Sequence, residues 1–272
     1  AGCSIRSQAG DLSPTGLVVG MTQLSCPIAL QHFEQRVWFH DGTATIPVGL
    51  YDAAHTSNTG SRTSSLVSAP PGTRSFGAAS GLLAGTSWRY IGSAMAGSTA
   101  WFFDGSSTWQ IGLADAEHVN TATGLASNTS SLLNASGQVA GSAVRYNGSV
   151  PNGSSAWFHD GWTRRIGLYD AEHTNSATGE QFNEPMFVAD ANYVSGHARR
   201  YHNGQERGRS AWYFDGSSTR KIGLVDDVHM LSSLNYRYNE IVAMNRAGQT
   251  FGHALRWADV YFTGVLVDVL SL

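Results

Sequence analysis

One motif occurs four times in this chain of 272 residues. Each copy joins an aromatic pair, an Asp-Gly step, a Gly-Leu step and a final D-x-x-H. The copies start at Val37, Ala100, Ala156 and Ala211 and read VWFHDGTATIPVGLYDAAH, AWFFDGSSTWQIGLADAEH, AWFHDGWTRRIGLYDAEH and AWYFDGSSTRKIGLVDDVH. Repetition on this scale indicates one supersecondary unit used several times.

A second marker, an apolar segment that ends in glycine, recurs between these motifs and occurs five times. Its copies are TGLVVG ending at Gly20, SGLLAG at Gly85, SGQVAG at Gly141, NYVSG at Gly196 and GQTFG at Gly252. The chain therefore holds five units, and VYFTGVLVDVLSL replaces the aromatic motif in the last one. Within each unit, four short runs alternate apolar and polar residues, which predicts four β-strands.

The turn signals between these runs predict antiparallel hairpins. Asp-Gly follows each aromatic strand and tolerates the positive φ that a tight turn needs. Four-stranded units arranged radially leave only short, protected sheet edges. We therefore expect an all-β, five-bladed β-propeller with four antiparallel strands per blade. We expect one domain over residues 1–272, with blades at about 1–52, 53–115, 116–170, 171–226 and 227–272.

Composition excludes several classes of function. The chain has 31 glycines and few charged residues (14%), which suits sheets and turns. No apolar window is long enough to span a membrane. A net charge of −3 without a basic cluster argues against a nucleic-acid partner. We expect a monomer.

The two cysteines and the first residues indicate export. Cys3 and Cys26 both fall in the first unit, where they form either a disulfide or two buried thiols. The chain starts Ala-Gly-Cys without an apolar leader, as a mature product does after signal cleavage. We expect a secreted, extracellular or periplasmic protein.

The repeats also resemble a known family. The run Asn-Ala-Ser-Gly-Gln-Val-Ala-Gly at 134–141, followed by Ala-Trp-Phe-x-Asp-Gly and Ile-Gly-Leu, is similar to the extracellular bacterial repeats named for their His-Ala-Phe signature. Here Ala-Trp-Phe replaces His-Ala-Phe. The resemblance implies propeller-like blades and a secreted or surface location, and it implies no particular activity.

The D-x-x-H step offers a candidate metal site. The loops that carry it run back toward the axis of a propeller, so four imidazoles could meet at one mouth of the channel and bind a transition metal. In the alternative, each histidine hydrogen-bonds toward a strand tryptophan and locks its blade to the neighbouring blade, because the same four units also carry matching tryptophans. The candidate ligands are His55, His118, His173 and His229.

Two glutamates break the repeat. Glu184 and Glu240 occupy equivalent positions on successive first strands, where the third unit has Thr129. Each follows an asparagine, and we expect these asparagines to bind ligand. Two carboxylates at the channel entrance could be an acid and base pair for cleaving glycosides, or could pair with arginines of neighbouring blades. The asparagines are Asn128, Asn183 and Asn239.

A third cluster combines arginine, tyrosine and histidine. In the run from Ser195 to His202, His197 and Tyr201 could move a proton, and Arg200 could neutralise a uronate carboxylate. The Arg-aromatic step recurs in other units, which favours an interblade ion pair instead. Separately, Trp109 and Trp162 are not repeated, and exposed tryptophans suit stacking on sugar rings.

These patterns lead to one preferred function and two alternatives. We expect a ligand, preferably a carbohydrate, at the channel mouth formed by the D-x-x-H loops and the first strands. The alternatives are a metal-dependent or glycan-cleaving enzyme and a structural or adhesion protein. The sequence leaves open whether any cofactor is bound; the only candidate is a transition metal on the four loop histidines.

Overall fold

The computed structural model describes residues 3–13, 15–26, 33–67, 76–77, 81–257 and 270–271. This part of the chain is all-β, with short 3₁₀ turns and no α-helix. The all-β expectation is thus confirmed. The strands form five antiparallel groups in chain order, which we call units one to five.

Unit one contains β1 (Ser4–Leu12), β2 (Val18–Ser25), β3 (Phe33–His40) and β4 (Thr45–Val48). Unit two contains β5 (Arg62–Leu66), β7 (Leu82–Ile91), β8 (Ala94–Phe103) and β9 (Thr108–Ile111), with β6 (Phe76–Gly77) beside β7. In each unit the strands pair in sequence order, so the predicted hairpins form.

Units three and four repeat this arrangement. Unit three contains β12 (Asn128–Leu133), β13 (Val139–Asn147), β14 (Val150–His159) and β15 (Thr163–Ile166), preceded by the hairpin of β10 (Val119–Asn120) and β11 (Leu125–Ala126). Unit four contains β16 (Gln181–Val188), β17 (Val194–His202), β18 (Gln205–Phe214) and β19 (Thr219–Ile222).

Unit five contains β20 (Met230–Leu231), β21 (Tyr236–Met244), β22 (Thr250–Ala254) and β23 (Leu270–Ser271). The third strand predicted for this unit, from Val260 onward, lies mostly outside the described residues. Its last residues, Leu270 and Ser271, pair with β22.

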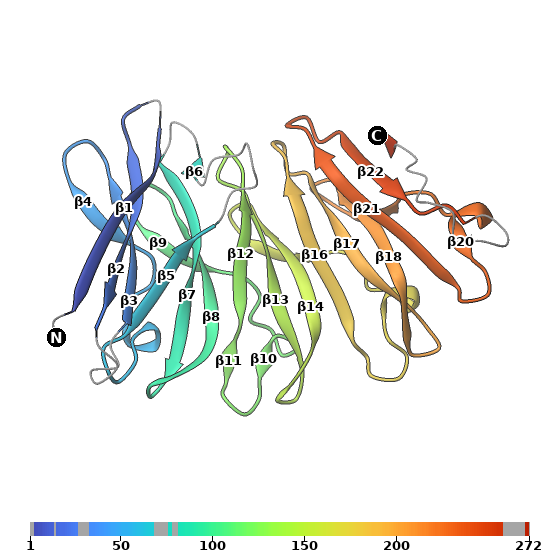
Figure 1. Cartoon of the computed structure of the whole chain (residues 1–272), viewed down its shortest axis with the longest axis horizontal. Helices are drawn as coiled ribbons and strands as arrows, with labels where there is room; N and C mark the ends of the chain where they lie inside the picture. The colour runs from blue at the N-terminus through green and yellow to red at the C-terminus, as the bar shows by residue number, and fades with distance from the viewer. Residues whose placement is uncertain are drawn as a thin grey trace.

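Successive units lie side by side, and the chain ends fall at opposite sides of the array (Figure 1). Short parallel pairings join β3 to β5, β14 to β16 and β18 to β21, the last at Arg209 and Tyr238. No such pairing joins units two and three within the described residues. Among the described strands none of unit one pairs with unit five, so the ring closure expected from the sequence is absent here.

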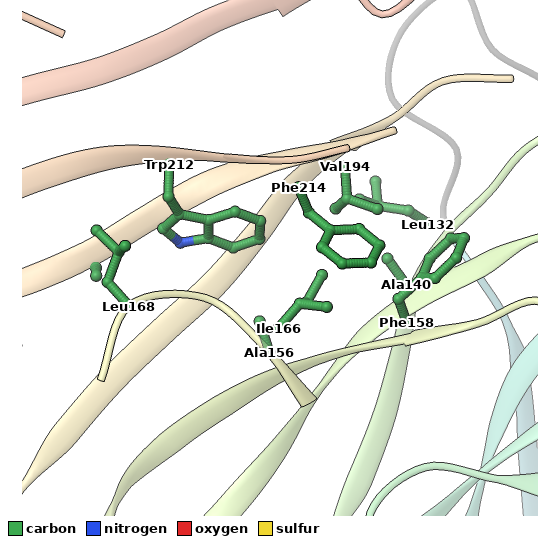
Figure 2. Close-up of a cluster of buried hydrophobic side chains, with 10 residues drawn as sticks. Leu132, Ala140, Ala156, Phe158, Ile166, Leu168, Val194, Trp212 and Phe214 are labelled. Atoms are coloured by element: carbon green, nitrogen blue, oxygen red, sulfur yellow. The ribbon is translucent and has the colours of Figure 1, made fainter. Parts of the chain in front are cut away.

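The core lies between units. Figure 2 shows the contact between units three and four, where Leu132, Phe158 and Ile166 meet Trp212 and Phe214. Equivalent clusters join unit one to two and unit two to three, and each is built around the repeated tryptophan of the later unit. Trp101, Trp157 and Trp212 are fully buried.

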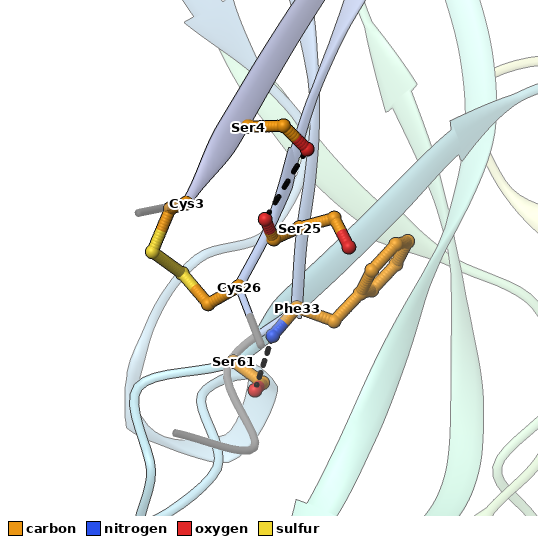
Figure 3. The surroundings of a disulfide bond; sticks show 6 residues. All are labelled: Cys3, Ser4, Ser25, Cys26, Phe33 and Ser61. Atoms are coloured by element: carbon orange, nitrogen blue, oxygen red, sulfur yellow. Dashed lines mark hydrogen bonds between the residues drawn. A yellow bond between two sulfur atoms is a disulfide. The ribbon is translucent and has the colours of Figure 1, made fainter. Parts of the chain in front are cut away.

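A disulfide ties β1 to β2, as one of the two readings of the cysteines predicts. Cys3 and Cys26 are bonded, and Ser4 Oγ donates a hydrogen bond to the Ser25 carbonyl at 3.3 Å (Figure 3). The disulfide and this hydrogen bond therefore both join the start of β1 to the end of β2.

Candidate functional site

Two carboxylate–imidazole pairs occupy the same position in units four and five. Glu184 on β16 is the register partner of His197 on β17, and Glu240 on β21 is the partner of His253 on β22. The carboxylate Oε2 lies 3.4 Å from the imidazole Nε2 in the first pair and 3.5 Å in the second. We call these four residues the Glu–His face.

Other units carry uncharged residues at these positions. The register places Thr129 opposite Ser142 in unit three and Ser65 opposite Thr86 in unit two. In unit one, Gln8 lies opposite Met21. Glu–His pairs therefore occur at this position in units four and five alone among the described residues.

An aromatic ring holds each imidazole. The Phe182 ring stacks on His197 with centroids 6.5 Å apart, and the Tyr238 ring stacks on His253 at 6.4 Å. The Tyr238 hydroxyl also donates to Glu240 Oε2 at 2.8 Å. Because each ring lies two residues before its glutamate, strand alternation puts both side chains on one side of the sheet.

Arginines complete the surroundings. Arg199 lies 4.1 Å from the Phe182 ring centroid and forms ion pairs with Glu180 and Glu206. Arg209 lies 5.8 Å from the Tyr238 ring centroid and forms no ion pair within the described part of the chain. Its position on β18, beside β21, places a cation between the two Glu–His pairs.

The two pairs differ in exposure, since the imidazole and carboxylate side chains of the unit-five pair are 26% and 29% exposed. The Glu184 side chain is 48% exposed, whereas that of His197 is 4% exposed. Contact with the His197 imidazole, helped by the charges of Arg209 and Arg199, holds the pKa of Glu184 below its usual value although burial opposes this. Glu184 is therefore an ionised, accessible carboxylate at neutral pH.

The sequence predicted three of these four residues and missed His253. A signal for it exists, because Gly-His-Ala occurs at 196–198 and again at 252–254. In both copies the glycine ends the second marker, so the following histidine faces the glutamate of the first strand.

The three asparagines predicted to bind ligand instead form hydrogen bonds with the protein backbone. Asn183 Oδ1 accepts from the Leu168 N–H and its Nδ2 donates to the Leu168 carbonyl, both at 2.8 Å. Asn128 binds Leu113 and Asn239 binds Leu224 in the same way. All three side chains are buried. Each asparagine thus binds the N–H and the carbonyl of the leucine in the Gly-Leu step of the preceding unit.

The four loop histidines also lie apart. His55, His173 and His229 each end a 3₁₀ turn, as in η4 (Ala171–His173), and His118 lies in an equivalent turn. The Nδ1 of each histidine contacts the aspartate three residues earlier at 2.5–2.7 Å. In the described residues, three ligand-type atoms approach one another within 4.8 Å only at Asp170, Glu172 and His173. The structure therefore does not bring His55, His118, His173 and His229 together.

The alternative His–Trp contacts are not formed by His118 and His173, whose Nε2 atoms have no hydrogen-bond partner among the described residues. His55 Nε2 contacts the Thr99 hydroxyl at 3.0 Å, and the Trp101 indole donates to Ser64 Oγ at 3.0 Å. In the Asp170 group, Glu172 binds Arg200 at 2.7 Å and Lys221 at 2.6 Å. Glu172 lies on the loop between β15 and β16, and both of its cationic partners belong to unit four.

The remaining candidates are dispersed. Arg200 is 3% exposed and is held by Glu172. Tyr201 is buried, and burial raises the pKa of its hydroxyl to about 12. Trp109 and Trp162 are exposed on the hairpins of units two and three; Trp109 donates to Asp104 and Trp162 stacks on Arg164.

No protein-family profile matches the chain, and no curated protein matches it. Its fold is similar to the β-propeller domain of the Trilobed protease from Pyrococcus furiosus, at 9% identity and a TM-score of 0.44 over 81% of this chain and 52% of that one. It is also similar to the Hadza microbial sialidase Hz136, at 9% identity and a TM-score of 0.37, with 89% and 51% covered.

A third similar structure is Bacteroides ovatus Xyloglucan PUL GH43B, at 10% identity and a TM-score of 0.29, with 93% of this chain and 48% of that one covered. The chain spans about half the length of each of these three structures. Such distant likenesses assign no activity. Separately, the described residues contain no helix long and apolar enough to cross a membrane.

Proposed function

We propose that this protein binds a carbohydrate on the Glu–His face. The observation that carries the proposal is the pair of equivalent carboxylate–imidazole contacts in adjacent units, with Arg209 between them. Glu184 remains 48% exposed although its histidine partner is buried. An aligned carboxylate that still faces solvent retains acceptor capacity for a ligand.

The chemistry of the face suits a polyhydroxylated ligand. Ionised carboxylates accept hydrogen bonds from hydroxyl groups, and such charge-assisted bonds are stronger than neutral ones. Phe182 and Tyr238 fix the imidazoles by stacking, so the polar atoms are ordered before a ligand arrives. Two similar sites side by side would engage successive residues of one glycan chain, which raises avidity.

The internal repeat supplies a test. Unit three folds with Thr129 and Ser142 where unit four has Glu184 and His197. Glu184→Thr combined with His197→Ser should therefore fold and lose glycan binding, measured on a glycan array and then by titration calorimetry. The matched control exchanges Thr129→Ser and Ser142→Thr, and it should bind like the wild type. Unchanged binding by the unit-four variant would contradict the proposal.

Glycan cleavage is the second candidate, and one observation favours it. The ionised Glu184 has the protonation state that a base or nucleophile needs, while Glu240 accepts a hydrogen bond from Tyr238. If cleavage occurs, Glu184→Gln should abolish product formation while glycan affinity stays measurable. Full turnover by this variant would exclude Glu184 as a catalytic group.

The proposal includes a five-bladed propeller and export from the cell. Five successive units, with equivalent apolar contacts from unit one through unit four, support the five-bladed propeller. The Cys3–Cys26 disulfide is compatible with an oxidising compartment and so supports export. An experimental structure of the whole chain tests the blade count, and fractionation of the source cells tests the location. A reduced, cytosolic protein would contradict export.

A further inference from the structure

In each unit after the first, polar side chains form hydrogen bonds with the Gly-Leu step that follows the fourth strand of the preceding unit. The Leu50 N–H donates to Ser87 Oγ at 3.1 Å, and Asn128, Asn183 and Asn239 bind the next three leucines. A threonine of the fourth strand lies against the glycine N–H, with Gly167 N donating to Thr219 Oγ1 at 3.2 Å. These contacts define a socket for an apolar-Gly-Leu segment.

The segment needs glycine for two reasons. Gly49, Gly112, Gly167 and Gly223 have φ between 108° and 121°, a region that side chains with a Cβ rarely adopt. A Cβ on Gly112 would also lie 2.4 Å from Asn128 Oδ1. The socket therefore selects glycine by backbone conformation and by space.

Unit one has the same socket. Ser7 lies opposite Thr22 in the register, as Ser64 lies opposite Ser87 in unit two. Trp38 lies opposite Gly20, and Thr45 begins the fourth strand as the socket threonines of later units do. An open surface hollow of about 380 Å³, which we call the unit-one socket, is lined by Ser7, Thr22, Trp38 and Thr45.

The unit-one socket has the arrangement of the filled ones. Ser7 and Thr22 share a hydroxyl hydrogen bond of 2.9 Å, as Ser64 and Ser87 do. Thr45 contacts His40 Nδ1 at 3.0 Å, and Thr163 contacts His159 Nδ1 at the same distance. The unit-one socket differs in burial, because Trp38 is partly exposed whereas its three counterparts are fully buried. It also differs from unit two in that the Trp101 indole donates to Ser64 Oγ, whereas the Trp38 indole nitrogen has no hydrogen-bond partner among the described residues.

We propose that the unit-one socket binds an apolar-Gly-Leu segment of another polypeptide. The four apolar-Gly-Leu segments of the described chain already fill the sockets of units two to five. A second copy of this chain has its own four segments engaged in the same way. The occupant therefore comes from outside residues 1–272, and we assign it to an apolar-Gly-Leu segment that ends a four-stranded unit of a partner protein.

The chemistry of the occupant follows from the filled sockets. Its apolar side chains pack against the Trp38 ring, and its leucine N–H donates to Thr22, as Leu50 donates to Ser87. Its glycine N–H donates to Thr45. The site is preformed, so binding avoids most of the cost of ordering it.

A peptide with the sequence of residues 219–225, Thr-Arg-Lys-Ile-Gly-Leu-Val, tests this with the full chain. The readout is the indole N–H signals of the ¹⁵N-labelled protein during titration. We expect a saturable shift of the Trp38 signal and none of the exposed Trp109 signal. The same peptide with alanine for glycine should bind at least about tenfold more weakly, a difference of about 1.4 kcal/mol.

Two protein variants complete the experiment. Thr22→Val removes the hydroxyl that accepts from leucine and keeps the shape of the side chain, so it should weaken the glycine peptide and leave the fold unchanged. Trp38→Ala should abolish binding, with circular dichroism as the check on folding. Absence of saturable binding, or equal binding of the alanine peptide, would overturn the proposal. A socket found filled by the C-terminal residues of the same chain would also overturn it.

Discussion

The indole of Trp212 lies over Gly196, its register partner on the neighbouring strand. A Cβ on this glycine would lie 2.4 Å from Trp212 Cζ2 and 2.2 Å from the Glu184 carbonyl oxygen. The same relationship joins Trp38, Trp101 and Trp157 to the glycines of their own units. The two repeated markers of the sequence are thus halves of one contact.

We predict that Gly196→Ala destabilises the protein by about 3 kcal/mol or more, because a buried tryptophan and a backbone carbonyl must both move. Guanidinium unfolding followed by circular dichroism measures the loss. Gly10→Ala is the control, since its nearest atom lies 3.6 Å from the added Cβ. A loss below about 0.5 kcal/mol for Gly196→Ala would show that the strands separate at little cost.

The repeated elements of the fold could be predicted because their causes are local. Asp41 Oδ1, for example, accepts from the N–H groups of Thr43 and Ala44, both at 2.8 Å, so the Asp-Gly turn is specified within a few residues. The strands on either side follow from alternation. Closure of a ring depends on contacts between the two ends of the chain, and no local pattern specifies it.

The site could be predicted only in part. Glu184 and Glu240 stand out because they break the repeat, but His253 becomes visible only when the register puts it opposite Glu240. Asn183 is the opposite case. The sequence marks it as polar and repeated, and the structure shows both ends of its amide bonded to Leu168. A polar residue on a buried strand face can satisfy backbone groups of another unit, which spacing alone does not reveal.

We predict that Asn183→Asp costs about 2–4 kcal/mol, because a buried carboxylate replaces the amide that donates to the Leu168 carbonyl. Asn183→Ser should cost less, since Ser64 occupies the equivalent position in unit two. Thermal unfolding of both variants measures the difference. Glycan binding at a temperature where both are folded should stay unchanged. Loss of binding without loss of stability would instead assign Asn183 to a ligand.

The loop histidines should behave as structural residues. Burial lowers the pKa values of His118 and His173, although their aspartates oppose this, so both are neutral inside the protein at neutral pH. We predict that His118→Ala and His173→Ala each lower the free energy of unfolding by about 2–4 kcal/mol through a cavity and a lost hydrogen bond. Chelator should leave the melting temperature of the wild type unchanged. A fall in that temperature, reversed by zinc, would indicate ligation.

The ion pairs that join Glu172, on the loop before β16, to unit four should make the fold sensitive to acid. Burial raises the pKa of Glu172, but the hydrogen bond from Lys221 and the charge of Arg200 outweigh it and bring the pKa from 4.5 to about 2. A carboxylate with a lowered pKa in the folded state stabilises the fold at pH values above its unfolded pKa. That stabilisation is lost as the pH falls from about 4.5 to about 2.

We therefore predict that Glu172→Gln lowers the free energy of unfolding by about 2–3 kcal/mol at pH 7, since it leaves the buried Arg200 without its partner. The difference from the wild type should shrink steadily between pH 4.5 and pH 2. Glu117→Gln is the matched control, because Glu117 makes the equivalent contacts to Arg145 and Arg165 with a side chain that is 53% exposed. Its effect should be smaller, as solvent screens an exposed pair. Urea unfolding at a series of pH values measures both variants, and a Glu172→Gln loss that does not depend on pH would attribute the effect to packing rather than charge.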